Sequence, residues 1–362
     1  MSKEVQDMLS QSVNRMFSDM VDTRLIDAME AGEWPAALWQ AVEDAGFNQV
    51  LVADETSAGE ALWENALPLL HAIGFHRAPL PLAETMLANA LLSQAGLPVQ
   101  EGPLTLIQHR PSPGDGLSLR IEKDQLVLEG TAGAVPWARQ ARAIVVAGKV
   151  DLGQVVGLVQ SGTSRLGIKP GKNIAGEPRD EVRFEHAVCK AFAVCAGTVP
   201  DEPAHVYGAL ARAAMMAGAA QSVLHQSVAY ANDRVQFGRP IGKFQAIQQS
   251  LAILAGEVTS ARSAVAAACS CANPVPRVFH VAVAKIRAGQ AAGIAAGIAH
   301  QVHGAIGFTH EHSLHYATRR LWAWRAEFGA ESVWDAWLGR EAIAVGGDAF
   351  WRDLTARQGI KA

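Results

Sequence analysis

The residues of this chain best suited to bind a charged ligand lie close together near position 240. Arg234 is followed by Gly238, Pro240 and Gly242 within the run Arg-Val-Gln-Phe-Gly-Arg-Pro-Ile-Gly. A guanidinium binds a pyrophosphate as a two-pronged donor, and a glycine turn at the start of a helix adds backbone N–H groups. This order of residues therefore suits a dinucleotide. Taken alone, Arg234 would be interpreted first as a surface guanidinium beside Asp233.

A second group with possible chemistry is a set of five histidines. They are His300, His303, His310, His312 and His315. Imidazole is a common metal ligand, but the spacing of these residues matches no standard metal site. We therefore predict no metal site. We interpret His303 as a packing or capping group near a helix end rather than as a catalytic residue.

Two segments carry a resemblance to a known family. Residues 234–248, RVQFGRPIGKFQAIQ, resemble the flavin-binding signature of the acyl-CoA dehydrogenase superfamily, in which R-x-Q-F-G-x-P-I precedes a Phe-Gln pair. Residues 301–312, QVHGAIGFTHEH, look like the Q-x-H-G-G-x-G stretch that this family has at the corresponding distance downstream. Residues 130–147 are similar to a strand pair of the family's middle domain. The resemblance thus covers most of the chain.

The resemblance implies FAD as the cofactor, held at a subunit interface in dimers or dimers of dimers. The FAD-binding residues that it implies are Arg234, Gln236, Phe237, Gly238, Gln245, Gln301 and Gly304. Ala305 stands where the family has a second glycine, and its methyl group is expected to crowd the approach of the cofactor. An acyl-CoA substrate and an electron-transfer flavoprotein as electron acceptor are implied in the same way.

The family reaction needs one carboxylate base, because a proton leaves the carbon next to the thioester while a hydride goes to the flavin. The two positions that usually supply this glutamate correspond to Gly208 and Phe328, and the arginine that accompanies the first corresponds to Ala209. None of these can act as a base. Glu327 is the candidate that remains, with a surface or salt-bridged carboxylate as the alternative interpretation.

The loop that the family places against the flavin ring also differs. Residues 108–115 read QHRPSPGD here, in place of T-E-P-x-x-G-S-D. An intact adenosine-side motif without a base resembles the short subunit of heteromeric bacterial acyl-CoA dehydrogenases of steroid degradation. We therefore expect a cytoplasmic subunit in a heterotetramer, which shares its FAD site with a homologous catalytic partner. The alternatives are a homo-oligomeric enzyme that uses Glu327, and a non-redox scaffold of the same fold.

The elements that must position these residues follow from local patterns. Apolar residues at helical spacing predict helices before position 101, including one over Leu82–Gln94 that Gly96 ends. Short runs of Val, Ile and Leu predict an antiparallel β domain at 102–200, with strands within 117–127, 143–147, 155–159 and 181–184. Residues 201–362 have the composition of long helices, with breaks at Gly238–Pro240 and Pro274–Pro276. The expected fold is α+β: a helical domain at 1–101, the β domain, and a four-helix bundle.

Composition narrows the function classes. The net charge is −4 with both signs interspersed, which argues against a nucleic-acid partner. The apolar run at 291–299 is too short to cross a bilayer, so we expect no membrane segment. The four cysteines are Cys189, Cys195, Cys269 and Cys271, and their spacing predicts reduced thiols rather than a zinc or redox site.

Overall fold

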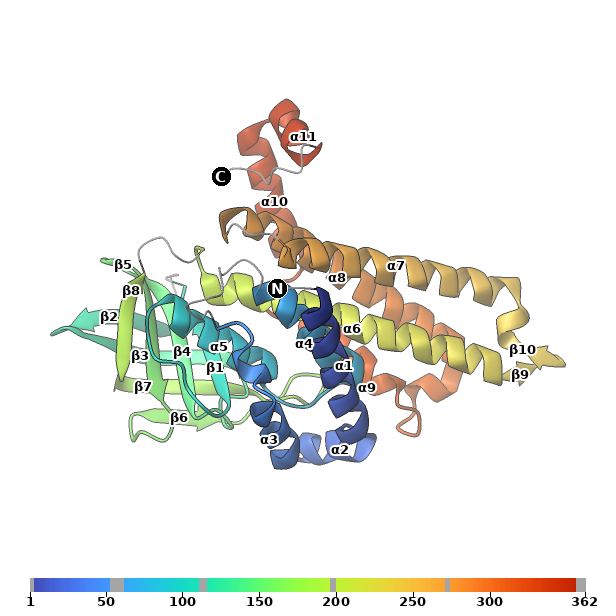
Figure 1. Cartoon of the computed structure of the whole chain (residues 1–362), viewed down its shortest axis with the longest axis horizontal. Coiled ribbons are helices and arrows are strands. Elements are labelled where there is room, and N and C mark those ends of the chain that lie inside the picture. Colours follow the sequence, from blue (N-terminus) through green and yellow to red (C-terminus); the bar gives the residue numbers. More distant parts are fainter. Residues whose placement is uncertain (1–2, 53–61, 111–115, 196–199, 271–273, 356–362) are drawn as a thin grey trace. The chain divides into compact units, whose positions relative to one another are not determined.

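The computed structural model describes residues 3–52, 62–110, 116–195, 200–270 and 274–355 (Figure 1). The contacts divide the chain into two compact units: residues 1–26, 67–78 and 209–362 form one, and residues 27–66 and 79–208 form the other. Helices α2, α4 and α6 contribute residues to both units. Because this division does not follow the sequence, the domain boundaries at 101 and 200 stay a prediction.

Helices fill the first part of the described chain. They are α1 (Lys3–Met20), α2 (Thr23–Ala31), α3 (Ala36–Asp44), the short 3₁₀ helix η1 (Phe47–Gln49), α4 (Leu62–His76) and α5 (Leu82–Gln94). The expected helix over Leu82–Gln94 has the predicted bounds. In α1, Val13 and Phe17 are fully buried whereas Met8 is exposed, so the helical spacing of apolar residues marks the packed face only in part. Every residue from Leu82 to Leu92 is buried, which makes α5 a core helix on all sides.

The strands that follow form two four-stranded sheets. They are β1 (Leu104–Gln108), β2 (Leu117–Glu122), β3 (Gln125–Pro136), β4 (Ala143–Val150), β5 (Gly153–Gln160), β6 (Leu166–Lys169), β7 (Arg179–Val188) and β8 (Ala191–Cys195). One sheet has the order β1-β4-β5-β8 and the other β2-β3-β7-β6. Aliphatic side chains of both sheets share one core, with Val146 and Val155 from the first and Leu128 and Val182 from the second.

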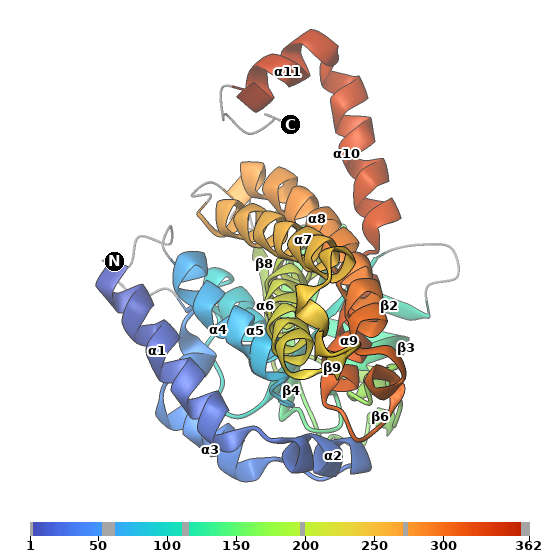
Figure 2. The ribbon, with the colours of Figure 1, turned by 90° about the vertical axis from the view of Figure 1, so that its right-hand side faces the viewer.

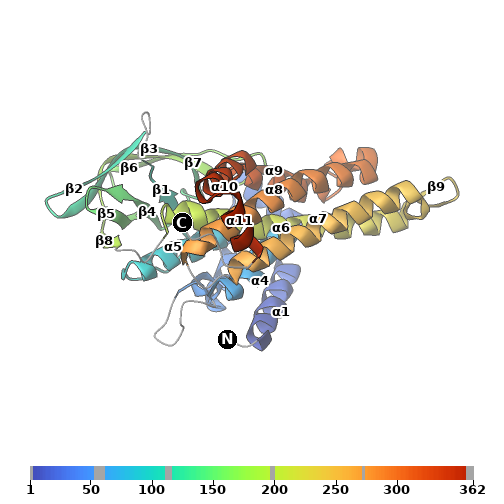
Figure 3. The same ribbon diagram turned by 90° about the horizontal axis from the view of Figure 1, so that it is seen from above.

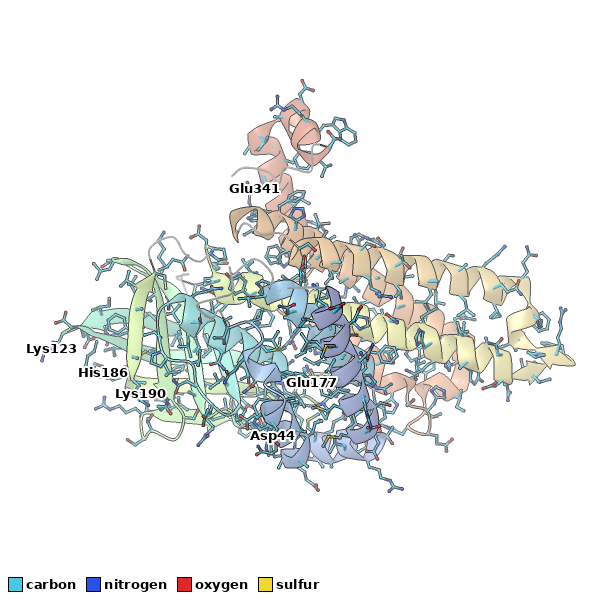
Figure 4. All side chains as sticks on the ribbon, in the orientation of Figure 1. Asp44, Lys123, Glu177, His186, Lys190 and Glu341 are labelled. Atoms are coloured by element: carbon cyan, nitrogen blue, oxygen red, sulfur yellow. The ribbon has the colours of Figure 1, made fainter. Side chains whose placement is uncertain are left out.

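Two details of the β domain differ from the sequence prediction. Strands β1 and β4 pair in parallel, so the domain is not antiparallel throughout. The run 117–127 is not one strand, because the chain reverses at Lys123 and Asp124, whose φ angles are 48° and 62°. Two consecutive left-handed residues form the tight turn that a two-residue hairpin requires. Figure 4 shows Lys123 at the tip of this hairpin.

Six helices make up the rest of the described chain. They are α6 (Pro203–Asp233), α7 (Gln245–Cys269), α8 (Pro274–His303), α9 (Leu314–Ala326), α10 (Glu331–Val345) and α11 (Gly347–Thr355). The short strands β9 (Val235–Gln236) and β10 (Arg239–Pro240) and the 3₁₀ helix η2 (Ile241–Lys243) connect α6 to α7. The 3₁₀ helix η3 (Gly304–Phe308) follows α8. Helices α6 and α7 run side by side toward the β9–β10 hairpin (Figures 1 and 3). The α+β class and the order of helices, sheet domain and helices agree with the prediction.

Helices α4 and α6 touch through two glycines. A Cβ atom built on Gly74 would lie 1.8 Å from the carbonyl oxygen of Met215, and one on Gly218 would lie 2.0 Å from that of His71. Neither space can hold even a methyl group. The two helices therefore meet backbone against backbone, which requires glycine on both sides of the crossing.

The cysteines and one helix bear on two further expectations. Cys189, Cys195 and Cys269 are buried thiols, as predicted, and Cys271 lies outside the described residues. Burial raises the pKa of Cys189 to about 12, so this thiol is unreactive near neutral pH. Helix α7 has the length and mean hydropathy of a membrane span, and 28% of its most apolar stretch is buried. Our expectation of no membrane segment considered only the run at 291–299, and α7 meets this criterion by length and composition alone.

Candidate flavin site and the α9–α10 turn

The Arg234 segment forms a tight hairpin directly after α6. The N–H of Arg234 donates to the carbonyl of Tyr230 at 2.9 Å, and the N–H of Ile241 donates to the carbonyl of Arg234 at 2.8 Å. Between them, β9 pairs with β10, and Phe237 and Gly238 form the turn with φ angles of 52° and 76°. Gly238 adopts this left-handed conformation easily, whereas Phe237 pays a steric cost for it.

The predicted cofactor-binding side chains of this segment face solvent. Arg234, Gln236 and Gln245 are exposed, and Phe237 is 90% exposed at the tip of the hairpin. Gln245 opens α7, and the residue before it, Phe244, gives the helix no side-chain cap. The first N–H groups of α7 thus have no capping side chain and attract an anion. A guanidinium, two amides and this helix end form a donor set that fits a dinucleotide phosphate.

The second predicted segment lies at the end of α8. Gln301, Gly304 and Ala305 are exposed, and Gly304 has a φ of 63° with open space around its Cα. Since Gly304 turns the chain out of the helix, its backbone is free to approach a ligand closely. Ala305 faces solvent, so the expected crowding by its methyl group stays a prediction.

Aromatic rings connect the two predicted segments. The ring of Tyr230, one turn before Arg234, stacks on His303 with centroids 4.5 Å apart and an interplanar angle of 24°. His312 lies edge-on to His303, with centroids 4.7 Å apart. Figure 2 views this end of the helices, where the hairpin and α9 are seen together. The packing role expected for His303 agrees with these contacts, and within the described ranges no group of histidine, cysteine and acidic side chains could hold a metal ion.

The loop expected to face the flavin ring belongs to the other compact unit. The amide of Gln108 donates to the carbonyls of His109 and Ala147, and its oxygen accepts from the N–H of Ala204. Arg110 and Glu202 form a two-pronged ion pair, at 2.9 and 2.7 Å. These polar groups are occupied within the unit. Residues 111–115, which include the only hydroxyl of the loop, lie outside the described residues.

The turn between α9 and α10 holds the base candidate in an ion pair. The Nε atom of Arg212, a buried guanidinium on α6, donates to Oε2 of Glu327 at 2.7 Å. The Cζ atom of Arg212 also lies 5.4 Å from the ring centroid of Phe328. Phe328 itself has a φ of 52°, which is costly for a bulky residue. Glu327 is thus salt-bridged in this structure, and its role as a base stays a prediction.

A buried lysine fixes the backbone of the same turn. Nζ of Lys285, on α8, donates to the carbonyls of Arg325 and Gly329, each at 2.8 Å. The indole N–H of Trp334 donates to the carbonyl of Phe328 at 3.0 Å. Burial lowers the pKa of Lys285 to about 8, against the opposing effect of two nearby carboxylates. Three carbonyls of a five-residue stretch are thus bonded to side chains from two helices.

Sequence reasoning missed Arg212 and Lys285 as partners of this turn. A charged residue in an otherwise apolar helical stretch was the available signal, because Arg212 lies within Leu210–Met216 and Lys285 within Val281–Ile286. Their partners could not be inferred, since Arg212 and Glu327 are 115 positions apart. Gly208 and Ala209, where the family's other base and its arginine would stand, are buried in α6.

The comparisons with known proteins agree with this order of helices, β domain and helices. Residues 206–340 match the family model for the C-terminal domain of acyl-CoA dehydrogenases. Acyl-CoA dehydrogenase IpdE2 of Mycobacterium tuberculosis is 26% identical over 321 residues, which cover 88% of this chain and 91% of the relative.

Two solved structures have the same fold. The ChsE4–ChsE5 complex from Mycobacterium tuberculosis matches with a TM-score of 0.85 and 22% identity, over 96% of this chain and 99% of that chain. A variant of the Tcur3481–Tcur3483 steroid ACAD matches with a TM-score of 0.84 and 23% identity, over 95% and 99%. The chain is thus similar in sequence and in fold to acyl-CoA dehydrogenases, and its residues 206–340 match the C-terminal domain of that family.

Proposed function

We propose that this chain is the FAD-binding, base-free subunit of a heteromeric acyl-CoA dehydrogenase. Its two flavin segments contribute to a composite cofactor site, and a homologous catalytic subunit supplies the carboxylate that removes the α-proton of the acyl-CoA. The observation that carries the proposal is the ion pair between Arg212 and Glu327, beside a phenylalanine at the position where the family has its base. An ion pair with a buried guanidinium stabilises the ionised form of a carboxylate and so makes it a weaker base.

The exposed donor set supports the FAD-binding half of the proposal. Arg234 would hold the pyrophosphate, and Gln236, Gln245 and Gln301 would bond to the adenosine side of the cofactor. Gly304 would let the backbone approach it. When FAD is bound, it supplies the hydride acceptor, while this chain's residues orient it and exclude water. A pure scaffold would have no physical need for this set of exposed donors around two glycine turns.

The partner and the substrate are inferred from the relatives. Two of the similar structures are complexes of two differently named components, and one is called a steroid ACAD. We infer a heterotetramer of two homologous chains that acts in the cytoplasm on a steroid-derived acyl-CoA, as part of steroid catabolism. An electron-transfer flavoprotein is the acceptor that fits this class of reaction.

The decisive experiment is to purify the chain alone and together with a longer acyl-CoA dehydrogenase encoded nearby. Flavin absorbance, mass in solution and oxidation of a panel of acyl-CoA thioesters are measured for both preparations. FAD and activity that appear only in the complex support the composite site. A chain that oxidises an acyl-CoA by itself would rule out the heteromer.

The alternative of a homo-oligomeric enzyme depends on Glu327. Such an enzyme would lose about 10²–10⁴-fold in turnover on Glu327→Gln, because the amide cannot act as a base. The alternative of a non-redox scaffold predicts no flavin in either preparation. No contact of the described residues favours either alternative over the heteromer.

A further inference from the structure

Three rings occupy the space between the two flavin-binding segments. Tyr230 precedes Arg234 by one helical turn, and its carbonyl accepts the N–H of Arg234. His303 is the last residue of α8 and separates Gln301 from Gly304. His312 lies at the other end of the segment 301–312, just before α9, and completes the cluster. We call Tyr230, His303 and His312 the ring clasp.

The contacts within the ring clasp are close. Tyr230 and His303 stack at 4.5 Å, and His312 meets His303 at 4.7 Å with an interplanar angle of 68° and Tyr230 at 6.1 Å with an angle of 89°. A hydrogen bond at 3.1 Å from the hydroxyl of Ser313 to the amide oxygen of Gln226 ties the same turn to α6. Any shift of one flavin segment against the other must therefore separate stacked rings.

The hydrogen bonds of His303 and His312 indicate which ring nitrogens carry a proton. Nδ1 of His303 lies 2.8 Å from the carbonyl of Ala299 and must donate to it, so Nε2 carries no proton in the neutral ring. That Nε2 atom is buried and makes no hydrogen bond to the described residues. Nδ1 of His312 accepts the N–H of Leu314 at 3.1 Å, so it too carries no proton. Adding a proton to either ring would place a charge opposite a donor or in a pocket without an acceptor.

The surroundings of the clasp are also closely packed. A Cβ atom on Gly307 would lie 3.0 Å from Cβ of His303 and 3.4 Å from Nδ1 of His300. His300 stacks on Phe308 with centroids 4.3 Å apart. The other titratable or charged groups of the segments around the clasp are Asp233, Arg234, His300, His310, Glu311, His315, Arg319 and Arg320. Only Asp233 and Glu311 among them are acidic, and both are exposed. The remaining groups are histidines and arginines, which cannot balance a positive charge on the clasp.

We propose that the neutral ring clasp positions the two flavin-binding segments for one FAD molecule, and that protonating it on acidification releases the cofactor. The inference rests on the proposed function, since it assumes that both segments bind FAD. Tyr230, His303 and His312 are positioning residues in this scheme, because they act through Arg234 and Gly304 rather than on FAD. Burial lowers the pKa of His303 and of His312, which keeps both rings neutral near pH 7.

The test measures FAD affinity by quenching of flavin fluorescence between about pH 5 and 8, where imidazole titrates. It uses whichever preparation binds FAD, the chain alone or the heteromer. The wild type is expected to lose affinity as the pH falls. His303→Phe keeps a ring in the stack but cannot be protonated, so its affinity should fall less on acidification. Tyr230→Ala should bind FAD about three- to tenfold more weakly at pH 8, and Tyr230→Phe should restore the wild-type value.

A matched control is His280→Phe. His280 is a half-buried histidine on the same helix, packs on Phe279, and also has a pKa lowered by burial, but it lies outside the clasp. This variant should keep the wild-type pH profile. Identical profiles for the wild type and His303→Phe, or wild-type affinity for Tyr230→Ala, would overturn the clasp while leaving the proposed function intact. No FAD binding at any pH, alone or in the heteromer, would overturn the proposed function itself.

Discussion

The flavin-binding segments and the α9–α10 turn lie in the same compact unit but treat their polar groups in opposite ways. At the hairpin and the end of α8, the guanidinium and the amides are exposed. At the turn, the side chain of Arg212 is 2% exposed and that of Glu327 17% exposed, and both are used up in an ion pair. The polar groups of the flavin-binding segments are thus accessible to a ligand, whereas the charged groups of the α9–α10 turn are paired with each other.

Under the proposed function, this difference separates cofactor binding from general-base catalysis. Binding needs donors that are exposed and preorganised, whereas a general base needs a carboxylate that can change its protonation state. The turn now holds its carboxylate with a buried cation, and Lys285 fixes the surrounding backbone. The same loop position that serves catalysis in the family serves stability here, according to the proposed function.

The largest effect is expected on stability, when the ion pair of the α9–α10 turn is removed. Arg212→Leu should lower the free energy of unfolding by about 3–5 kcal/mol, because it removes the buried cation that forms the ion pair with the carboxylate of Glu327. Thermal or urea unfolding measures this loss. The double variant Arg212→Leu with Glu327→Leu should recover most of it, since both charges of the ion pair are then replaced by apolar side chains. A single variant as stable as the wild type would show that the turn is not held by its charges.

The next largest effect is expected on FAD affinity, when a donor of the flavin-binding hairpin is removed without a change in stability. Arg234→Ala should weaken FAD binding about 10- to 100-fold, the range for a lost hydrogen bond to a charged group. The midpoint of thermal unfolding of the FAD-free protein should stay unchanged, because Arg234 is exposed. Arg239→Ala is the matched control: Arg239 lies in the same hairpin, over the ring of Phe244, and should leave FAD affinity near the wild-type value.

A smaller effect is expected in the pH dependence of stability, because the α9–α10 turn contains the buried Lys285. The folded-state pKa of Lys285 is about 8, below the 10.5 of an exposed lysine, so the unfolded chain binds more protons between these values. Stability from this group should therefore rise with pH from about 8 to 10.5, by on the order of 1–3 kcal/mol. A neutral amine still has two N–H groups for its two carbonyl partners. Lys285→Met should remove this rise in the free energy of unfolding. Urea unfolding at several pH values measures it, and a rise of the same size in the variant would contradict the assignment to Lys285.

The smallest effect is expected for the base candidate. Glu327→Gln should change the turnover of the heteromer by less than about twofold, far below the 10²–10⁴-fold loss expected for a general base. Turnover with saturating acyl-CoA, at a temperature where both proteins are folded, gives the comparison. The corresponding glutamate of the catalytic partner, changed to glutamine, serves as the positive control. A large loss for Glu327→Gln would reverse the assignment of the turn to structure.

Local patterns predicted most of the fold because they act over short distances. The bounds of α5 follow from Leu82 to Gln94 with a glycine two residues beyond, and the breaks at Gly238 and Pro240 follow from the same kind of signal. The parallel pairing of β1 with β4 was missed, because strand composition carries no information on direction. The reversal at Lys123 and Asp124 was missed because the pair lacks the glycine that marks many two-residue hairpin turns.

The candidate site was predictable only in part, for the same reason. The residues of the flavin segments follow one another in the chain, so a motif could identify them, and their roles stay a prediction. The state of Glu327 depends on Arg212, far away in the sequence, and on Lys285 from a third helix. Neither periodicity nor spacing specifies which cation meets which carboxylate after folding. The ring clasp likewise combines Tyr230 with histidines some seventy or more positions further along.

The crossing of α4 and α6 has a consequence for how this sequence can evolve. Core positions usually drift in pairs, because a larger side chain on one helix can be offset by a smaller one on its neighbour. Gly74 and Gly218 face main-chain atoms, which no substitution can make smaller. Mutational drift therefore has no compensating path at this crossing, and a deep mutational scan should find both positions intolerant while the alanines around them exchange freely with other small residues.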